Sequence, residues 1–194
     1  MTYSIIGSGN VGSALARQFA RHAVAAGIAN TQGADSMAAL VAETGDTVTA
    51  MTVQEALKAD IIILAIPFRA HAAVAAAASD WTGKIIIDAM NTYGIAPEEL
   101  GGRASSELVA DAFPGATIVK TFNQLPAKLL AMPAAEHGGR RVMFVSSNDE
   151  AAASTVTTLV EALGFAPISL GKINEGGALI GMGGALILQN LIKH

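Results

Sequence analysis

The chain has no cysteine and few charged or aromatic residues, and the shortages of cysteine and charge each exclude a class of function. Without cysteine there is no disulfide bond, no thiol nucleophile and no cysteine-based metal site. Only 14% of the residues are charged, about half the usual share, as expected when another subunit covers part of the surface. The net charge is −4 and no basic cluster is present, which argues against nucleic acid or an anionic membrane as a partner.

Metal and membrane sites also lack sequence support. The four histidines, His22, His71, His137 and His194, show no metal-ligand spacing, so we predict no metal site. The most apolar stretch, residues 176–188, is too short and too rich in glycine to cross a bilayer. A strand pattern begins at once at the N-terminus, where a signal peptide would place its own apolar core. We therefore expect a cytoplasmic protein.

What the chain does contain is a glycine-rich turn between a short apolar run and a helical pattern. Gly7, Gly9 and Gly12 have the G-x-G-x-x-G spacing of dinucleotide-binding loops. The first allows a tight turn, the second lets a pyrophosphate approach the backbone, and the third lets the helix pack close to the strand. We predict a dinucleotide site rather than a simple turn. Its phosphate-binding residues are Gly7, Ser8, Gly9, Asn10, Val11 and Gly12.

Short strand-like segments alternate with helix-like segments along the whole chain. Residues 61–66 and 85–88 are the clearest strands, almost wholly apolar as parallel strands buried on both faces should be. The alternation predicts an α/β fold, a Rossmann-type, doubly wound and mainly parallel sheet, in one NAD(P)-binding domain spanning residues 1–194.

Three local features refine this prediction. Thr52 and Glu55 have the spacing of a capping box. Ser147 or Asn148 is expected to cap a long helix that ends near Leu163. Residues 175–192 are interpreted as a glycine-interrupted helix, so we expect segment 172–194 to pack on the domain or on a dimer partner.

Ligands of such sheets lie outside the carboxyl ends of the strands. The predicted strand ends carry groups that are polar but almost without charge. Asp88, the exception, is either catalytic or a structural carboxylate bonded to backbone N–H groups. The further cofactor-binding residues predicted here are Asn30, Thr31, Gln32, Ile66, Pro67, Phe68, Ala89, Asn91 and Asn123.

The end of the second strand bears on the choice between NAD and NADP. An NAD site usually places Asp or Glu on the ribose about twenty residues after the last glycine, and Asn30, Thr31 and Gln32 stand there instead. Asp35 is close by but is better placed to cap a helix. Thr31 and Gln32 can donate hydrogen bonds to a 2′-phosphate, although no arginine adds a charge. We therefore predict NADP (NADPH).

An ordered set of motifs extends over nearly the whole chain. They are the N-terminal glycine loop, Ala29–Gly33, Leu64–Pro67, Ile87–Asn91 and Val119–Asn123. In this set the chain resembles the coenzyme F420-dependent NADP reductases, and the ferric-reductase domain of the STEAP proteins is similar. The resemblance implies F420 or a flavin as second substrate, and a homodimer with the C-terminal helix near the active cleft. Where that family usually has Ser and Arg after Asn30, this chain has Thr31 and Gln32.

The sequence therefore predicts an NADP-dependent oxidoreductase that transfers hydride between NADP(H) and a small-molecule acceptor, a deazaflavin or a flavin. One alternative is an NAD(P)-dependent reductase of a small carbonyl or imine, which needs a positioned acid. Lys120 and Tyr93 are the only candidates for that acid, and neither belongs to a recognisable pair. A second alternative is a non-catalytic dinucleotide-binding sensor. We assign no catalytic side chain.

Overall fold

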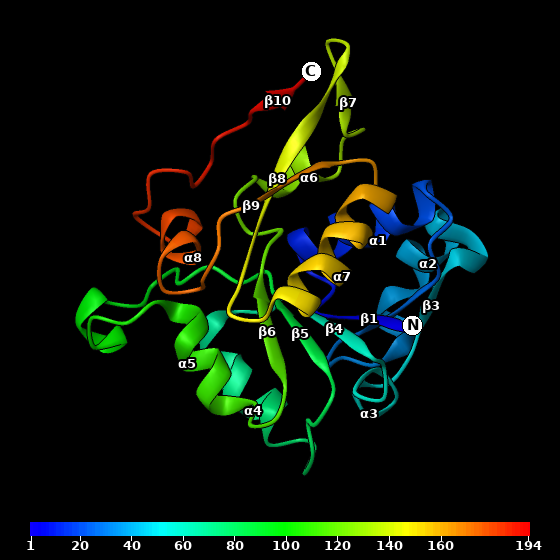
Figure 1. Ribbon diagram of the computed structural model, residues 1–194. Helices are drawn as coiled ribbons and strands as arrows, with labels where there is room; N and C mark the ends of the chain where they lie inside the picture. The colour runs from blue at the N-terminus through cyan, green and yellow to red at the C-terminus, as the bar shows by residue number, and fades with distance from the viewer.

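A single sheet runs through the middle of the molecule, and helices cover both of its faces (Figure 1). The computed structural model describes residues 1–194. Six parallel strands form most of the sheet, in the order β3-β2-β1-β4-β5-β6. They are β1 (Tyr3–Ile6), β2 (Ala26–Ala29), β3 (Val48–Ala50), β4 (Ile61–Leu64), β5 (Ile85–Asp88) and β6 (Thr117–Lys120). The predicted doubly wound, mainly parallel sheet is confirmed.

Helices lie on both faces of the sheet and enclose two separate apolar cores. The first core packs α1 and α7 against one face, and the second packs α3, α4 and α5 against the other. The helices are α1 (Asn10–Arg21), α2 (Ala38–Thr44), α3 (Val53–Ala56), α4 (His71–Ala75), α5 (Ser105–Ala112), α6 (Ala127–Leu130), α7 (Glu150–Ala162) and α8 (Gly176–Ile180). Short 3-10 helices occupy Ala34–Met37, Gly45–Thr47, Phe68–Ala70 and Pro97–Leu100.

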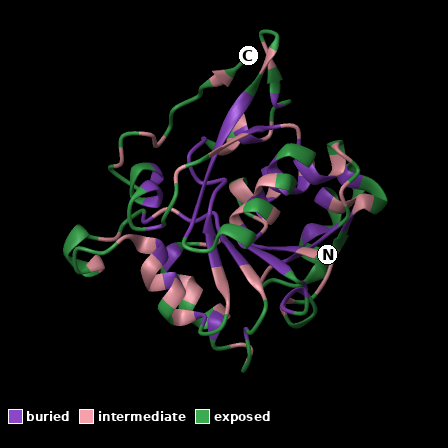
Figure 2. Cartoon of the chain, in the orientation of Figure 1, coloured by how far each residue is buried: buried purple, intermediate pink, exposed green.

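Strand β4 shows why the central strands are apolar at every position. Ile61 and Ile63 belong to the first core, whereas Ile62 and Leu64 belong to the second. Successive side chains of a strand point to opposite faces, and both faces are covered here, so no position remains for a polar residue. Figure 2 shows the strands as a buried band through the centre, with most exposed residues on the outer helices and loops.

Beyond β6 the sheet changes direction. Strand β8 (Gly139–Ser147) is antiparallel to β6 and parallel to β9 (Ala166–Ser169). It also pairs with β7 (Ala135–Glu136) in a hairpin that is not among the predicted elements. The tip of the hairpin is His137–Gly138, with φ angles of 49° and 79°. Two positive φ angles are what a two-residue type I′ turn requires.

The prediction of a helix over residues 175–192 is wrong. Only Gly176–Ile180 is helical, and the rest of the segment forms turns before strand β10 (Ile192–Lys193) pairs antiparallel to β8. Glycine in a helix interior costs backbone entropy, and Gly183 takes a φ of 81° that a helix does not allow. The segment nevertheless packs on the domain, where the amide N–H of Leu188 donates to the carbonyl of Gln124 at 2.8 Å.

One predicted helix cap is confirmed and another is wrong. Thr52 and Glu55 form the predicted capping box, with each side chain bonded to the other residue's backbone N–H. Helix α7 is capped by Asp149, whose Oδ1 accepts from the N–H of Ala152 at 2.8 Å, and not by Ser147 or Asn148. The side chain of Ser147 instead donates to the carbonyl of Ile118.

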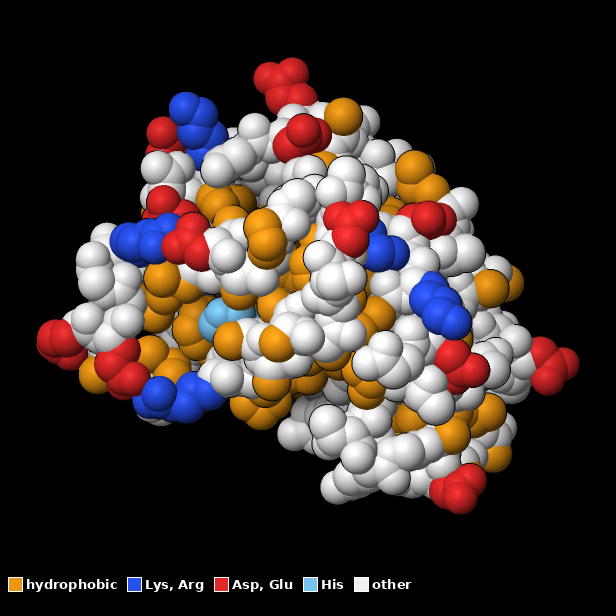
Figure 3. Space-filling view, turned by 90° about the horizontal axis from the view of Figure 1, so that it is seen from below, with side chains coloured by type: hydrophobic (Ala, Val, Ile, Leu, Met, Phe, Trp, Pro, Cys, Tyr) orange, Lys and Arg blue, Asp and Glu red, His pale blue; other side chains and the backbone are white.

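Several of the few surface charges form ion pairs: Arg17 with Glu43, Arg69 with Glu99 and Arg103 with Asp111. Seen from below, apolar side chains form a broad area in the middle, and most acidic and basic side chains lie nearer the rim (Figure 3). None of the helices is both long enough and apolar enough to span a lipid bilayer.

Candidate functional site

The glycine-rich loop has the geometry that its sequence predicts. Gly7 has a φ of 109°, and a Cβ there would lie 2.2 Å from the carbonyl oxygen of Ala65. A Cβ on Gly12 would lie 1.8 Å from the carbonyl oxygen of Gly7. The backbone of the helix therefore packs directly against the backbone of the loop, with no room for a side chain. A Cβ on Gly9 would meet no atom of the chain within 4 Å. The space above Gly9 is therefore open, as a bound pyrophosphate needs.

Next to this loop lies a cavity of about 660 Å³ at the carboxyl ends of β1, β2 and β4. Its volume is within the usual range for small-molecule sites. Eight predicted cofactor residues line it: Gly7, Ser8, Gly9, Asn30, Thr31, Gln32, Ile66 and Pro67. Asn10 and Val11 begin helix α1 beside the loop, where the first backbone N–H groups of a helix attract an anion.

The cavity also has an apolar wall, which is not among the predicted cofactor-binding residues. Ala70, Ala73, Val74 and Ala77 line it from the α4 region, and Val53 lines it from α3. The first four recur at steps of three, one and three residues, which is the spacing of one helical face. That spacing is visible in the sequence.

At the rim of the cavity, the side chain of Asn30 is fully committed to the chain itself. Its Nδ2 donates to the hydroxyls of Ser8 at 2.7 Å and Ser36 at 2.8 Å, and its Oδ1 accepts from the N–H of Gln32 at 2.8 Å. The side chains of Thr31 and Gln32 are exposed and line the same rim. No charged side chain lines the cavity, so it neither repels nor strongly attracts a 2′-phosphate.

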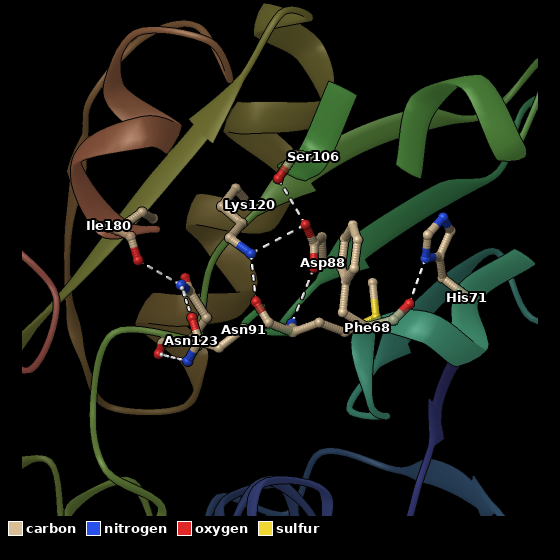
Figure 4. Close-up of polar contacts among 9 residues, drawn as sticks. Phe68, His71, Asp88, Asn91, Ser106, Lys120, Asn123 and Ile180 are labelled. Carbon is tan, nitrogen blue, oxygen red and sulfur yellow. Dashed lines mark hydrogen bonds and ion pairs between the residues drawn. The ribbon is translucent and has the colours of Figure 1, made fainter. Parts of the chain in front are cut away.

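Two asparagines join the carboxyl ends of β5 and β6. Asn91 Nδ2 donates to the backbone carbonyl of Asn123 at 2.8 Å, and Asn123 Nδ2 donates to Asn91 Oδ1 at 3.0 Å and to the carbonyl of Ile180 at 2.6 Å (Figure 4). Because a backbone carbonyl can only accept, both amide orientations are fixed. Asn123 is 3% exposed, and its Oδ1 has no hydrogen-bond partner. The pair therefore contains one unpaired acceptor, which is buried near the strand ends.

Beneath these asparagines lies a buried ion pair. Lys120 Nζ is 3.1 Å from Asp88 Oδ2 and 2.5 Å from the carbonyl oxygen of Met90 (Figure 4). The hydroxyl of Ser106 donates to Asp88 Oδ2 at 2.6 Å, and the N–H of Met90 donates to Asp88 Oδ1 at 3.0 Å. Asp88 is therefore the carboxylate bonded to backbone N–H that the sequence allowed as one of two roles.

Some predicted site residues lie away from the cavity. Phe68 is 8% exposed and belongs to the second core, with its ring centroid 4.7 Å from that of His71. It turns inward because the apolar ring gains more from burial than from lining a rim. Ala89 is buried in the first core. Neither lines the cavity, and neither do Asn91 and Asn123, so their roles as cofactor-binding residues stay predictions.

Known proteins are similar to this chain in sequence and in fold. Residues 2–92 match the family described as NADP oxidoreductase, coenzyme F420-dependent. The N-terminal half of the chain is similar to this family. A curated relative is metalloreductase STEAP3 of Rattus norvegicus, 31% identical over 122 residues. The match covers 62% of this chain and 24% of that protein, so the chain spans about a quarter of its relative.

Two solved structures extend the family comparison over more of the chain. A hypothetical protein, SMa0349 from Sinorhizobium meliloti, is 41% identical with a TM-score of 0.95, covering 100% of this chain and 96% of that one. A putative F420-dependent NADP-reductase from Arthrobacter sp. FB24 is 26% identical with a TM-score of 0.72, covering 89% and 86%. The family resemblance predicted from the motifs is confirmed.

Proposed function

We propose that the chain is an NADP-dependent oxidoreductase that transfers hydride between NADP(H) and a deazaflavin or flavin-like acceptor. One observation carries this proposal. The strand ends hold a glycine loop, a cavity and a pair of positioning amides, and no acid–base pair faces them. Hydride transfer between two rings needs positioning and exclusion of water, whereas the cofactors supply the electronic chemistry.

The residues present fit a bound NADP(H). The open space over Gly9 and the first N–H groups of α1 suit the pyrophosphate. The apolar wall of the cavity suits an adenine ring, and the free groups of Thr31 and Gln32 suit a 2′-phosphate. Asn123 Oδ1 is buried and unpaired in the free chain, and it would accept from an N–H donor such as the nicotinamide carboxamide once binding uncovers it. When bound, NADPH supplies the hydride.

The carbonyl or imine alternative is less well supported. Lys120 is 1% exposed and its Nζ is engaged by Asp88 and Met90, so it is not free to protonate a substrate. Tyr93 is 68% exposed, whereas a positioned general acid must lie within hydrogen-bond reach of the reacting group. A reduced flavin-like ring can take its proton from solvent, so the absence of a positioned acid favours that acceptor.

We further propose that the chain forms a homodimer through its C-terminal segment. Leu179, Met182, Leu188 and Leu191 lie on this segment and are between 43% and 56% exposed. Exposed apolar side chains gathered on one segment are typical of an interface. Size-exclusion chromatography with light scattering would test this, with Leu188→Asp as the variant expected to be monomeric. A monomeric wild type would refute it.

The function itself is tested with purified protein, NADPH and a panel of acceptors: F420, FMN, FAD and ferric chelates. Calorimetric titration with NADPH should show saturable binding. One or more of the deazaflavin and flavin acceptors should then speed the loss of reduced-nicotinamide absorbance. Binding without turnover of any acceptor would favour the sensor alternative, and turnover of small carbonyls or imines alone would favour that reductase. Absence of NADPH binding would remove the proposal altogether.

A further inference from the structure

A second cavity, of about 230 Å³, lies between the loop after β5 and the C-terminal segment. It shares no residue with the larger cavity beside the glycine loop. Thr92 lines it, directly after Asn91 in the chain. Its volume is below the usual 300–1,000 Å³ of sites that enclose a drug-sized ligand. A small molecule, or one end of a larger molecule, is what fits.

The side chain of Thr92 carries the inference. Thr92 is 9% exposed, yet its hydroxyl makes no hydrogen bond within the chain. The hydroxyl is not shut off from solvent, so it keeps some accessible surface although most of the residue is buried. Because Thr92 lines the second cavity, a ligand there can form a hydrogen bond with this hydroxyl.

Further hydrogen-bond donors surround the same space. Ser105 begins the eight-residue helix α5 and lines the cavity, together with Asn174 and Arg103. Arg103 Nη1 is bonded to Asp111 at 2.7 Å, which leaves its other N–H groups free. The carboxylate of Glu107 is turned back onto the N–H of Ala104 at 2.8 Å and does not line the cavity. The lining therefore contains one cation, which is paired with Asp111 outside the lining, and no acidic group.

The opposite wall is built from small residues. Gly177, Ala178 and Gly181 of the C-terminal segment face the loop. A Cβ on Gly181 would meet only the carbonyl oxygens of Ala178 at 3.5 Å and Gly177 at 3.6 Å. Both are ordinary contact distances, and the φ of Gly181, −73°, suits any residue. A larger side chain is therefore sterically possible there, and the space stays open because glycine occupies the position.

We propose that this second cavity binds an oxyanion, a carboxylate or phosphate group of the hydride acceptor, and that Thr92 is a residue that determines acceptor specificity. The inference rests on the proposed function only in naming the acceptor as the source of the oxyanion. Hydroxyl, amide and guanidinium donors around one small space suit such a group, and hydrogen bonds to a charged acceptor are the strong ones. The site would hold one end of the acceptor beside Asn91.

The test uses the full chain labelled with 15N and saturated with NADP+, so that the glycine loop does not bind the probe. Inorganic phosphate and acetate are titrated separately while the amide signals of Ser105, Asn174 and Gly177 are followed. We expect saturable shifts with at least one probe. Thr92→Val should weaken binding about ten- to hundredfold, the range for losing a hydrogen bond to a charged group. Thr92→Ser, which keeps the hydroxyl, should retain most of it.

Control variants distinguish a loss of probe binding at the cavity from a general effect of substitution. Gly181→Val should block binding, whereas Ala185→Val, on the exposed part of the same segment, should not. Thr158→Val, on an exposed face of α7, is the control for Thr92→Val. Absence of saturable shifts in the wild type, or equal affinities in wild type and Thr92→Val, would overturn the inference. Calorimetry with NADPH on the same samples reports separately on the proposed function.

With a confirmed flavin acceptor, FMN and riboflavin form a matched pair, because they differ only in the phosphate. The wild type should prefer FMN in kcat/KM, and Thr92→Val should reduce that preference about tenfold or more. Riboflavin turnover should change little. An unchanged preference would contradict the assignment of the phosphate to this cavity.

Discussion

Lys120 and Asp88 face each other across β6 and β5, with Nζ 3.1 Å from Oδ2 and both side chains no more than 1% exposed. Each is the last residue of its strand, so strand register alone makes them neighbours. Both also bond the backbone of Met90, the residue before Asn91. The ion pair therefore fixes the backbone on which the Asn91–Asn123 pair stands.

Lys120→Met should lower the free energy of unfolding by roughly 3–5 kcal/mol, because it leaves a buried carboxylate without its cation. The double variant Asp88→Asn/Lys120→Met should recover more than about 1 kcal/mol of this loss. Urea unfolding at neutral pH measures both. If folded Lys120→Met is obtained, its kcat should fall less than about tenfold, since loss of a general acid costs 10²–10⁴. A stability equal to wild type would contradict the role of the pair.

Gly9→Val should lose NADPH binding, whereas Gly12→Ala should lose stability. Gly9 has open space above it, so the valine variant should fold normally and lose NADPH binding. Gly12 touches the carbonyl of Gly7, so even alanine should lower the melting temperature. Titration calorimetry and thermal unfolding on both variants give the comparison. Normal NADPH affinity in folded Gly9→Val would remove the phosphate-binding role of the loop.

Gln32→Arg should tighten NADPH binding by about 1.5–3 kcal/mol, because a guanidinium adds a charged donor beside Thr31. NADH has no 2′-phosphate, so its affinity should hardly change. The ratio of the two dissociation constants is the measurement. An equal gain for both cofactors would mean that residue 32 does not face the 2′ position.

Asn123→Ala should reduce the preference for a carboxamide. The 3-acetylpyridine analogue of NADPH keeps the ring carbonyl but replaces NH2 by methyl, so it cannot donate to Asn123 Oδ1. Wild type should bind NADPH more tightly than the analogue by about 0.5–1.5 kcal/mol, and the variant should lose this difference. 2′,5′-ADP, which lacks the nicotinamide, is the control and should bind both proteins alike. A preference that survives the substitution would exclude Asn123 as the acceptor.

His22 should make stability depend on pH near neutrality. Burial, and secondarily the nearby charge of Arg21, lower the pKa of His22 from its ordinary value of 6.5. As the pH falls below about 6.5, the unfolded chain takes up the proton first, so the free energy of unfolding decreases. His22→Asn should remove this decrease in urea unfolding measured between about pH 7 and 5.5. A parallel decrease in wild type and variant would assign it to other groups.

The acidic groups with lowered pKa values titrate at a lower pH than His22, so they do not interfere with the measurement on His22. Hydrogen bonds from Thr52 and Thr2 lower the pKa values of Glu55 and Asp60 from 4.5 and 3.8. Stability from these carboxylates is present above their ordinary pKa values and is lost only as the pH falls through the lowered ones. It therefore changes below the range in which His22 titrates.

Much of the fold could be predicted because its signals are local. The apolar run of β4 and the glycine loop depend on neighbours in the chain, and so does the Thr52–Glu55 capping box. The β7–β8 hairpin was missed because its turn uses His137 and Gly138 instead of Asn-Gly, although histidine does enter positive φ more often than most residues.

The site could be predicted only in part. The rule that ligands lie at the carboxyl ends of strands located Thr31 and Gln32 at the cavity rim. It could not show that Phe68 turns into the core or that Lys120 is bonded to Asp88. Those outcomes depend on strand register and packing between segments far apart in sequence, which no local pattern encodes. The roles of the predicted cofactor residues stay predictions until binding is measured.

The order in which the chain is made separates the two cavities in time. Every residue that lines the larger cavity lies between Ile6 and Ala77. The smaller cavity needs Thr92 and also Met182, and the contact of Asn123 with Ile180 spans 57 residues. Translation therefore completes the proposed nucleotide cavity long before the last wall of the proposed acceptor cavity. In the nascent protein, the half that would bind the nucleotide is complete in sequence while the half that would choose its partner is still being synthesised.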